Sequence, residues 1–185
     1  MTITEWAKEI HENAVKHGWW ETKRSTGEVI ALIHSELSEA LEEARDNRPM
    51  MYVLGPNGEE ICTPCYFNGR KPEGIAVELA DAVIRVLDFA EYMRLTLKDT
   101  DTTKIKDRGG WCDDLGTTIA VLHEVVAMLG LAIAKEKVKD ILGMMWSFVA
   151  CIELYLKNQG VDLWQVIEIK HNYNKGRPYK HGKAF

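Results

Sequence analysis

The segment from residue 73 to about residue 97 constrains the fold more than any other part of this sequence. At about 100° per residue it forms a helix with one apolar face and a second apolar face on its other side. A narrow stripe between these faces holds Glu78, Asp81, Arg85 and Asp88. A helix that is apolar on two sides is expected to be largely buried. Buried carboxylates need a cation or a metal ion, and Arg85 can neutralise only one of the three acids.

Helical patterns also dominate the rest of the chain. A β-hairpin is predicted within residues 50–67, and a polar linker at about 98–110. We therefore expect an all-α protein whose four-helix-bundle-like core consists of two helix pairs, with the short hairpin or loop inserted. The other predicted helices span residues 4–17 with Thr4 as N-cap, 27–46, 114–134, 136–158 and 162–175 with Asp162 as N-cap.

The length of 185 residues is typical of one domain, so we expect a single α-helical domain over 1–185 with an insertion at about 49–70. A basic tail, 170–185, contains five of the 23 lysines and arginines and none of the 28 acids. The rest of the chain therefore carries a net charge of −10. This acidity argues against binding to duplex nucleic acid.

We expect no membrane partner, because no stretch was found that approaches about 18 uncharged apolar residues. The first residues lack a basic and then apolar leader, so the expected location is the cytoplasm. Cys62 and Cys65 form a Cys-x-x-Cys pair, but no second pair matches it, so unpaired thiols are favoured over a zinc site.

The chain also contains a faint internal similarity between residues 31–34 and residues 120–123. In that register the second helix pair repeats the bundle pattern of the first without its acids, and Glu36 corresponds to Val125. The alternative interpretation is chance similarity between amphipathic helices.

Two pairs of acids stand three residues apart, so the members of each pair project from neighbouring positions of one helix. Glu36 and Glu39 form the first pair, and Glu78 and Asp81 form the second. Two packed helices that each offer such a pair would bring four carboxylates together. Hard oxygen ligands of this kind suit Mg²⁺, and Mn²⁺ as an alternative.

The spacing Glu36-Leu37-Ser38-Glu39 followed by Glu78-Leu79-Ala80-Asp81 resembles the signature of the MazG-like all-α NTP pyrophosphatases. The resemblance covers most of residues 10–95 and again 165–183. Further segments that resemble the family are His17-Gly18-Trp19-Trp20, Ile33-His34-Ser35-Glu36, Lys71-Pro72-Glu73-Gly74-Ile75 and Arg177-Pro178-Tyr179-Lys180-His181-Gly182-Lys183.

The resemblance implies an enzyme that hydrolyses a nucleoside triphosphate between its α and β phosphates, for nucleotide-pool control or house-cleaning. It implies that Glu36, Glu39, Glu78 and Asp81 are the catalytic and Mg²⁺-binding residues. One glutamate, with Glu39 as a candidate, would orient or deprotonate the attacking water. Members of the family form dimers or tetramers, so a homodimer or homotetramer is expected.

The same resemblance implies substrate contacts near the C-terminus. Lys170 and Asn174 lie four residues apart and match a late Lys/Asn pair of the family. Arg177 and Lys180 are further phosphate candidates, with a solvated basic tail as the alternative. Trp20, next to Trp19, is a candidate for stacking on a base, with packing at the end of the core as the alternative.

Two other functional classes remain as hypotheses. The chain could be a MazG-like nucleotide sensor with weak or no turnover, or a helical interaction protein whose acids are simply solvated.

Overall fold

The computed structural model describes residues 1–62, 69–102 and 113–182. Within these ranges the chain is all-α with one small sheet, as predicted. The elements are α1 (Ile3–Lys16), α2 (Thr26–Arg45), β1 (Val53–Leu54), β2 (Glu60–Ile61), α3 (Ile75–Tyr92), α4 (Leu115–Ala134), α5 (Val138–Asn158), α6 (Leu163–Lys175) and the 3₁₀ helix η3 (Tyr179–Gly182).

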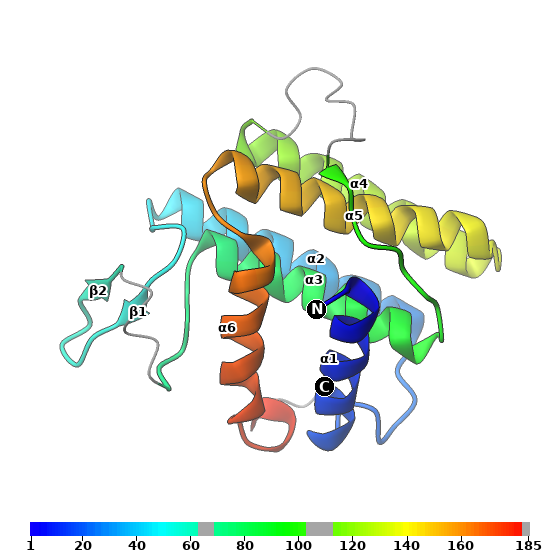
Figure 1. The fold of residues 1–185 in the computed structure, drawn as a ribbon, viewed down its shortest axis with the longest axis horizontal. Helices are drawn as coiled ribbons and strands as arrows, with labels where there is room; N and C mark the ends of the chain where they lie inside the picture. Colours follow the sequence, from blue (N-terminus) through cyan, green and yellow to red (C-terminus); the bar gives the residue numbers. More distant parts are fainter. Residues whose placement is uncertain (63–68, 103–112, 183–185) are drawn as a thin grey trace.

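The helices form three layers, which Figure 1 shows one above the other. The pair α4 and α5 packs on the pair α2 and α3, and α1 and α6 cover the opposite side of α3. The central position of α3 follows from its two apolar faces, because each face packs against a different layer. Two predicted helix pairs therefore do form the bundle core.

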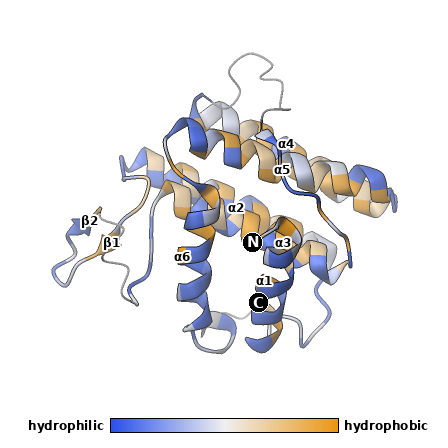
Figure 2. Cartoon of the chain, viewed as in Figure 1, coloured by the Kyte–Doolittle hydropathy of each residue, from blue (hydrophilic) through white to orange (hydrophobic). Residues whose placement is uncertain are grey.

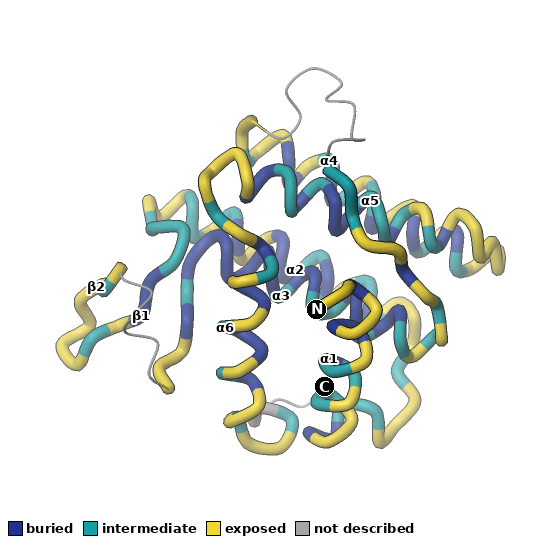
Figure 3. The backbone as a smooth tube through the Cα atoms, viewed as in Figure 1, coloured by how far each residue is buried: buried dark blue, intermediate teal, exposed yellow. Residues whose placement is uncertain are grey.

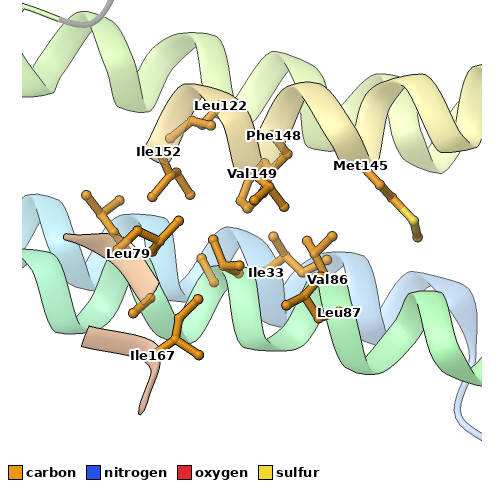
Figure 4. Close-up of a cluster of buried hydrophobic side chains, with 14 of the residues drawn as sticks. Ile33, Leu79, Val86, Leu87, Leu122, Met145, Phe148, Val149, Ile152 and Ile167 are labelled. Carbon is orange, nitrogen blue, oxygen red and sulfur yellow. The ribbon is translucent and has the colours of Figure 1, made fainter. Parts of the chain in front are cut away.

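The core lies mainly between the two helix pairs. Figure 4 shows Ile33, Leu79 and Val86 from the lower pair facing Phe148 and Ile152 from α5. All five side chains are at most 1% exposed. The burial map in Figure 3 shows the same pattern, with buried positions concentrated on α3 and on the facing sides of its neighbours.

Several helix ends differ from the prediction by a few residues, and two of the differences have a clear local cause. The N-cap of α1 is Thr2 rather than Thr4, and Thr2 forms a reciprocal capping box with Glu5. Helix α3 begins at Ile75 and ends at Tyr92 rather than near residue 97. The chain leaves α3 because Arg94 adopts a positive φ of 56°, which does not continue a right-handed helix. Asp162 caps α6 as predicted.

The insertion contains the predicted hairpin, with Val53 paired to Ile61 in antiparallel register. Its base is anchored next to α3 by the bridge between Tyr52 and Glu73. Gly74 then enters α3 with a φ of 114°, and a Cβ there would lie 2.7 Å from the carbonyl oxygen of Met50. Only glycine accepts both the conformation and the contact. The remaining predicted insertion and most of the predicted linker lie outside the described residues.

Helices α2 and α4 meet at His34 and His123, which occupy corresponding positions of the internal similarity. Their rings stack with centroids 5.0 Å apart, and their Nδ1 atoms are 2.7 Å apart. Corresponding residues that touch each other are expected near an approximate twofold axis. This contact is consistent with the repeat interpretation, which stays a prediction.

Helix α4 is more apolar than predicted. It is long and apolar enough to cross a membrane, by length and composition only, and 33% of its most apolar window is buried in the fold. Figure 2 shows hydrophobic residues along α4 and α5. The prediction that no stretch of the chain approaches the apolar composition of a membrane-spanning helix was therefore wrong. A single helix of this kind is nevertheless weak evidence that the chain crosses a membrane.

Candidate functional site

Three of the four predicted acids converge where α2 packs against α3. Glu36 comes from α2, and Glu78 and Asp81 come from successive turns of α3. One carboxylate oxygen from each lies within 4.8 Å of the other two. Glu36 and Glu78 are each only 5% exposed. These three residues, named here the carboxylate cluster, offer the hard oxygen ligands that could hold a metal ion.

Two cations compensate the cluster from opposite sides. Arg85, one turn beyond Asp81 on α3, donates from Nε to Glu36 Oε1 over 2.6 Å and places Nη2 2.5 Å from the same oxygen. Lys170 reaches in from α6, with Nζ 2.8 Å from Asp81 Oδ2. The side chain of Lys170 is only 2% exposed. Two cations from separate elements thus compensate part of the charge of the three acids.

The surroundings raise the pKa of two of the three acids, Glu36 and Glu78. Burial raises the pKa of Glu36 to about 7, because desolvation and Asp81 together outweigh the opposing effect of Arg85. Burial also raises the pKa of Glu78 to about 8, against the opposing effect of Lys170. Shifts of this size mark groups whose charge the folded protein does not fully compensate. A divalent cation would supply that charge, so the donor set fits a hard metal ion.

Glu39, the fourth predicted ligand, lies outside this group of three. It is exposed, and its Oε1 accepts a hydrogen bond from Ser35 Oγ over 2.9 Å. It is nevertheless close enough for its charge to contribute to the raised pKa values of Glu36 and Glu78. Its role as a ligand stays a prediction.

A pocket of about 100 Å³ lies beside the carboxylate cluster, between α1, α3 and α6. Asp81, which belongs to the cluster, and Arg85, which pairs with Glu36, both line this pocket and so connect it to the cluster. Two of the predicted substrate residues, Asn174 and Arg177, line it as well. Asn174 is 8% exposed, and its Oδ1 has no hydrogen-bond partner in the described structure. Lys170, the other predicted substrate residue on α6, contacts the cluster and does not line the pocket.

Lys180 lies apart from this pocket lining. Its backbone N–H donates to the carbonyl oxygen of His17 over 2.9 Å, and its Nζ lies 5.7 Å from the ring centre of Tyr179. The side chain is thus placed on η3 and not beside the cluster. A phosphate contact from Lys180 stays a prediction that these positions do not favour.

Trp20 is held in a packed cluster of side chains. Its Nε1 donates to Asp88 Oδ1 over 2.9 Å, and its ring stacks on Tyr92 with centroids 4.0 Å apart. His11 Nδ1 lies 2.6 Å from the same Asp88 oxygen. These contacts match the alternative interpretation of Trp20, as a residue that packs at the end of the core. Trp19, and not Trp20, lines the pocket beside the cluster.

Two motif segments that lie far apart in the sequence pack against each other next to the pocket. The hydroxyl of Tyr179 donates to Glu21, and the Lys180 N–H bonds to His17. Gly18 has a φ of 81°, and a Cβ there would lie 2.1 Å from Cε2 of Tyr179. This close approach brings the C-terminal segment with Arg177 and the loop with Trp19 to one pocket.

Three polar residues that line the pocket were not predicted as site residues. Arg24 comes from the loop before α2, Asn13 comes from α1, and His171 comes from α6. None of them belongs to a spaced motif, so no periodic signal could have identified them. Their position depends on how the loop, α1 and α6 pack on α3.

A comparison of the chain with family models, with curated proteins and with solved structures found no match in any of the three. The resemblance to MazG-like pyrophosphatases therefore rests on the quoted motifs and is a basis for proposals.

Proposed function

We propose that the chain is a Mg²⁺-dependent nucleoside triphosphate pyrophosphohydrolase. The observation that carries the proposal is the convergence of the buried Glu36 and Glu78 with the half-buried Asp81 within 4.8 Å. Three carboxylates gathered this way destabilise the fold unless their charge is compensated, and Arg85 and Lys170 supply only two positive charges. The pocket with cationic walls beside the cluster supports a phosphate-bearing substrate.

In the proposed reaction, water oxygen bonds to the α phosphorus and the bond from that phosphorus to the bridging oxygen breaks. The products are a nucleoside monophosphate and pyrophosphate, with the proton of the water released. When bound, Mg²⁺ would offset phosphate charge and lower the pKa of the attacking water. Glu36, Glu78 and Asp81 would hold it.

The remaining roles fall to residues around the cluster. Arg85 and Lys170 hold Glu36 and Asp81 in place. Glu39 lies outside the group of three, and its carboxylate would orient or deprotonate the attacking water. This division of roles assigns Glu39 to the reacting water rather than to the metal.

The test is an assay of canonical NTPs and dNTPs with Mg²⁺ that resolves monophosphate, diphosphate, pyrophosphate and phosphate. The proposal requires monophosphate and pyrophosphate in equal amounts, and loss of both after chelation. Glu78→Gln should lower turnover at least about 100-fold, in the range seen when charge-stabilising groups are removed. Glu42→Gln is the matched control, because Glu42 is exposed on α2 and pairs with Arg45.

Three results would contradict the proposal. Diphosphate with phosphate would show cleavage at the wrong bond. Full activity of Glu78→Gln would show that the site is elsewhere. Nucleotide binding without turnover of any substrate in the panel would favour the sensor hypothesis instead.

A further inference from the structure

The pocket beside the carboxylate cluster is too small for a whole nucleotide. Its volume is about 100 Å³, whereas sites for small organic ligands begin at about 300 Å³. A phosphate group or a pair of phosphates is compact enough, and a nucleoside is not. If the reacting bond of a triphosphate lies at the carboxylate cluster, either its nucleoside end or its pyrophosphate end could extend into the pocket.

Three arginines from three different parts of the chain line this small volume. Arg85 comes from α3, Arg24 from the loop before α2, and Arg177 from the turn after α6. Guanidinium groups bind phosphate oxygens through two parallel hydrogen bonds, which makes a group of them typical of a phosphate site. The wall of the pocket thus has the chemistry of an anion site.

Arg24 is the most informative of the three. Its side chain is only 9% exposed, and its nearest carboxylate, Glu28, lies 3.7 Å from Nε, beyond hydrogen-bond distance. Its guanidinium lies 4.8 Å from the ring centre of Trp19, which holds it toward the pocket. Burial lowers the pKa of Arg24, against the weaker effect of Glu28. Glu28 is thus a partner for Arg24 only at the limit of ion-pair distance, and its charge does not offset the burial of the guanidinium.

The acids that line the pocket are already engaged by other groups. Asp81 pairs with Lys170, and Asp88 accepts from Trp20 and contacts His11. The charge of Asp88 still acts on Arg24, but this effect is weaker than that of burial. For Arg177, no carboxylate in the described ranges lies within ion-pair distance.

Asn174 adds a second, independent sign of a missing ligand. It lines the pocket, is more than nine-tenths buried, and leaves Oδ1 without a partner. The amide can turn to present its Nδ2 donor instead, which suits a phosphate oxygen. A polar group buried in this way indicates a ligand atom that the protein alone does not supply.

We infer that this pocket binds the pyrophosphate part of the triphosphate, with Arg24 and Arg177 as the residues that contact its oxygens. The inference rests on the proposed function and deepens it, because it sets the direction of the substrate. The leaving pyrophosphate lies between α1 and α6, and the nucleoside lies on the other side of the carboxylate cluster. Arg24 thereby becomes a substrate-binding residue.

The test is calorimetric titration with inorganic pyrophosphate in the presence of EDTA, so that no metal site contributes. Wild type should bind pyrophosphate more tightly than orthophosphate. Arg24→Gln and Arg177→Gln should each weaken pyrophosphate binding about tenfold or more, as expected for a hydrogen-bonded charged partner. Arg45→Gln is the matched control, because Arg45 is exposed at the end of α2, and it should bind as wild type does. Thermal melting of each variant confirms that it is folded.

The outcomes separate this inference from the proposed function. If Arg24→Gln and Arg177→Gln bind pyrophosphate as wild type does, the inference is wrong even if the enzyme turns over. If the two variants lose affinity for a nucleoside monophosphate but not for pyrophosphate, the opposite direction of the substrate is correct. If pyrophosphate binding depends on Arg24 but no triphosphate is hydrolysed, the anion pocket stands and the proposed function falls.

Discussion

The Nζ of Lys170 on α6 lies 2.8 Å from Oδ2 of Asp81 on α3. The lysine is 2% exposed and the aspartate side chain 19% exposed. This ion pair ties the last long helix to the carboxylate cluster, 89 residues earlier in the chain. It makes both the stability of the α3–α6 packing and the charge of the cluster depend on one buried amine.

Lys170→Met should lower the free energy of unfolding at pH 7 by about 3 kcal/mol, because it leaves Asp81 without its cation. Urea unfolding measures this. Lys175→Met is the control: its amine lies 2.5 Å from Glu9 but the side chain is 45% exposed, so the loss should stay below about 1 kcal/mol. Equal losses of unfolding free energy in the two variants would show that the buried ion pair contributes no more to stability than the exposed one.

The raised pKa of Glu78, about 8, predicts a pH dependence of stability in EDTA. The folded protein holds this proton more tightly than the unfolded chain, whose value is near 4.5. Stability from this group is therefore present below about pH 4.5 and is lost as the pH rises through about 8. Each such group contributes a slope of up to about 1.4 kcal/mol per pH unit.

Glu78→Gln should make this decline shallower between pH 5 and pH 8. The comparison is made between variants, because other groups titrate as well. Glu36, Glu43, Asp88 and His11, with raised pKa values, act in the same direction as Glu78. His34, His123 and His171, with lowered pKa values, act in the opposite direction. Urea unfolding at a series of pH values gives the two slopes. Parallel curves for wild type and Glu78→Gln would contradict the assigned shift.

Magnesium should stabilise the folded protein at pH 8 by about 2.7 kcal/mol at a concentration 100 times its Kd. Glu36→Gln should abolish this gain, since Glu36 belongs to the carboxylate cluster. Glu39→Gln should keep most of it, because Glu39 lies outside that group. Thermal melts with Mg²⁺, and with KCl at equal ionic strength, make the comparison. A complete loss in Glu39→Gln would restore Glu39 as a ligand, and no gain in wild type would refute the metal site.

Trp20→Phe should affect stability rather than substrate binding. The phenyl ring can still stack on Tyr92, but Asp88 loses the indole donor, which costs about 1–2 kcal/mol. The KM for a substrate found in the nucleotide panel should stay within about twofold, whereas Trp19→Ala should raise it because Trp19 lines the pocket. Trp164→Phe removes a similar donor to Glu153 far from the pocket and serves as the control. A large KM effect of Trp20→Phe would reinstate Trp20 as a base-stacking residue.

Several features of the fold and site could be predicted from local patterns. The two apolar faces of the 73–97 segment predicted a buried α3, and twelve of its 18 residues are buried. The spacing of Glu78 and Asp81 placed both acids on one side of that helix. Local patterns were less exact at helix ends, where Thr2 replaced Thr4 as the cap and Arg94 ended α3 early. These ends depend on single side-chain bonds and backbone angles that hydrophobic periodicity does not report.

What the sequence alone determined is the periodic part of this protein: its helices, its apolar faces and the acid pairs three residues apart. Only the tertiary structure decided which groups meet. It separated Glu39 from the other three acids, buried Lys170 against Asp81, and brought Arg24 to the same pocket as Arg177. The physical reason is the distance along the chain over which each effect acts. Helical spacing orders neighbours within a few residues, whereas contacts between distant segments depend on how whole helices pack, and no local pattern records that packing.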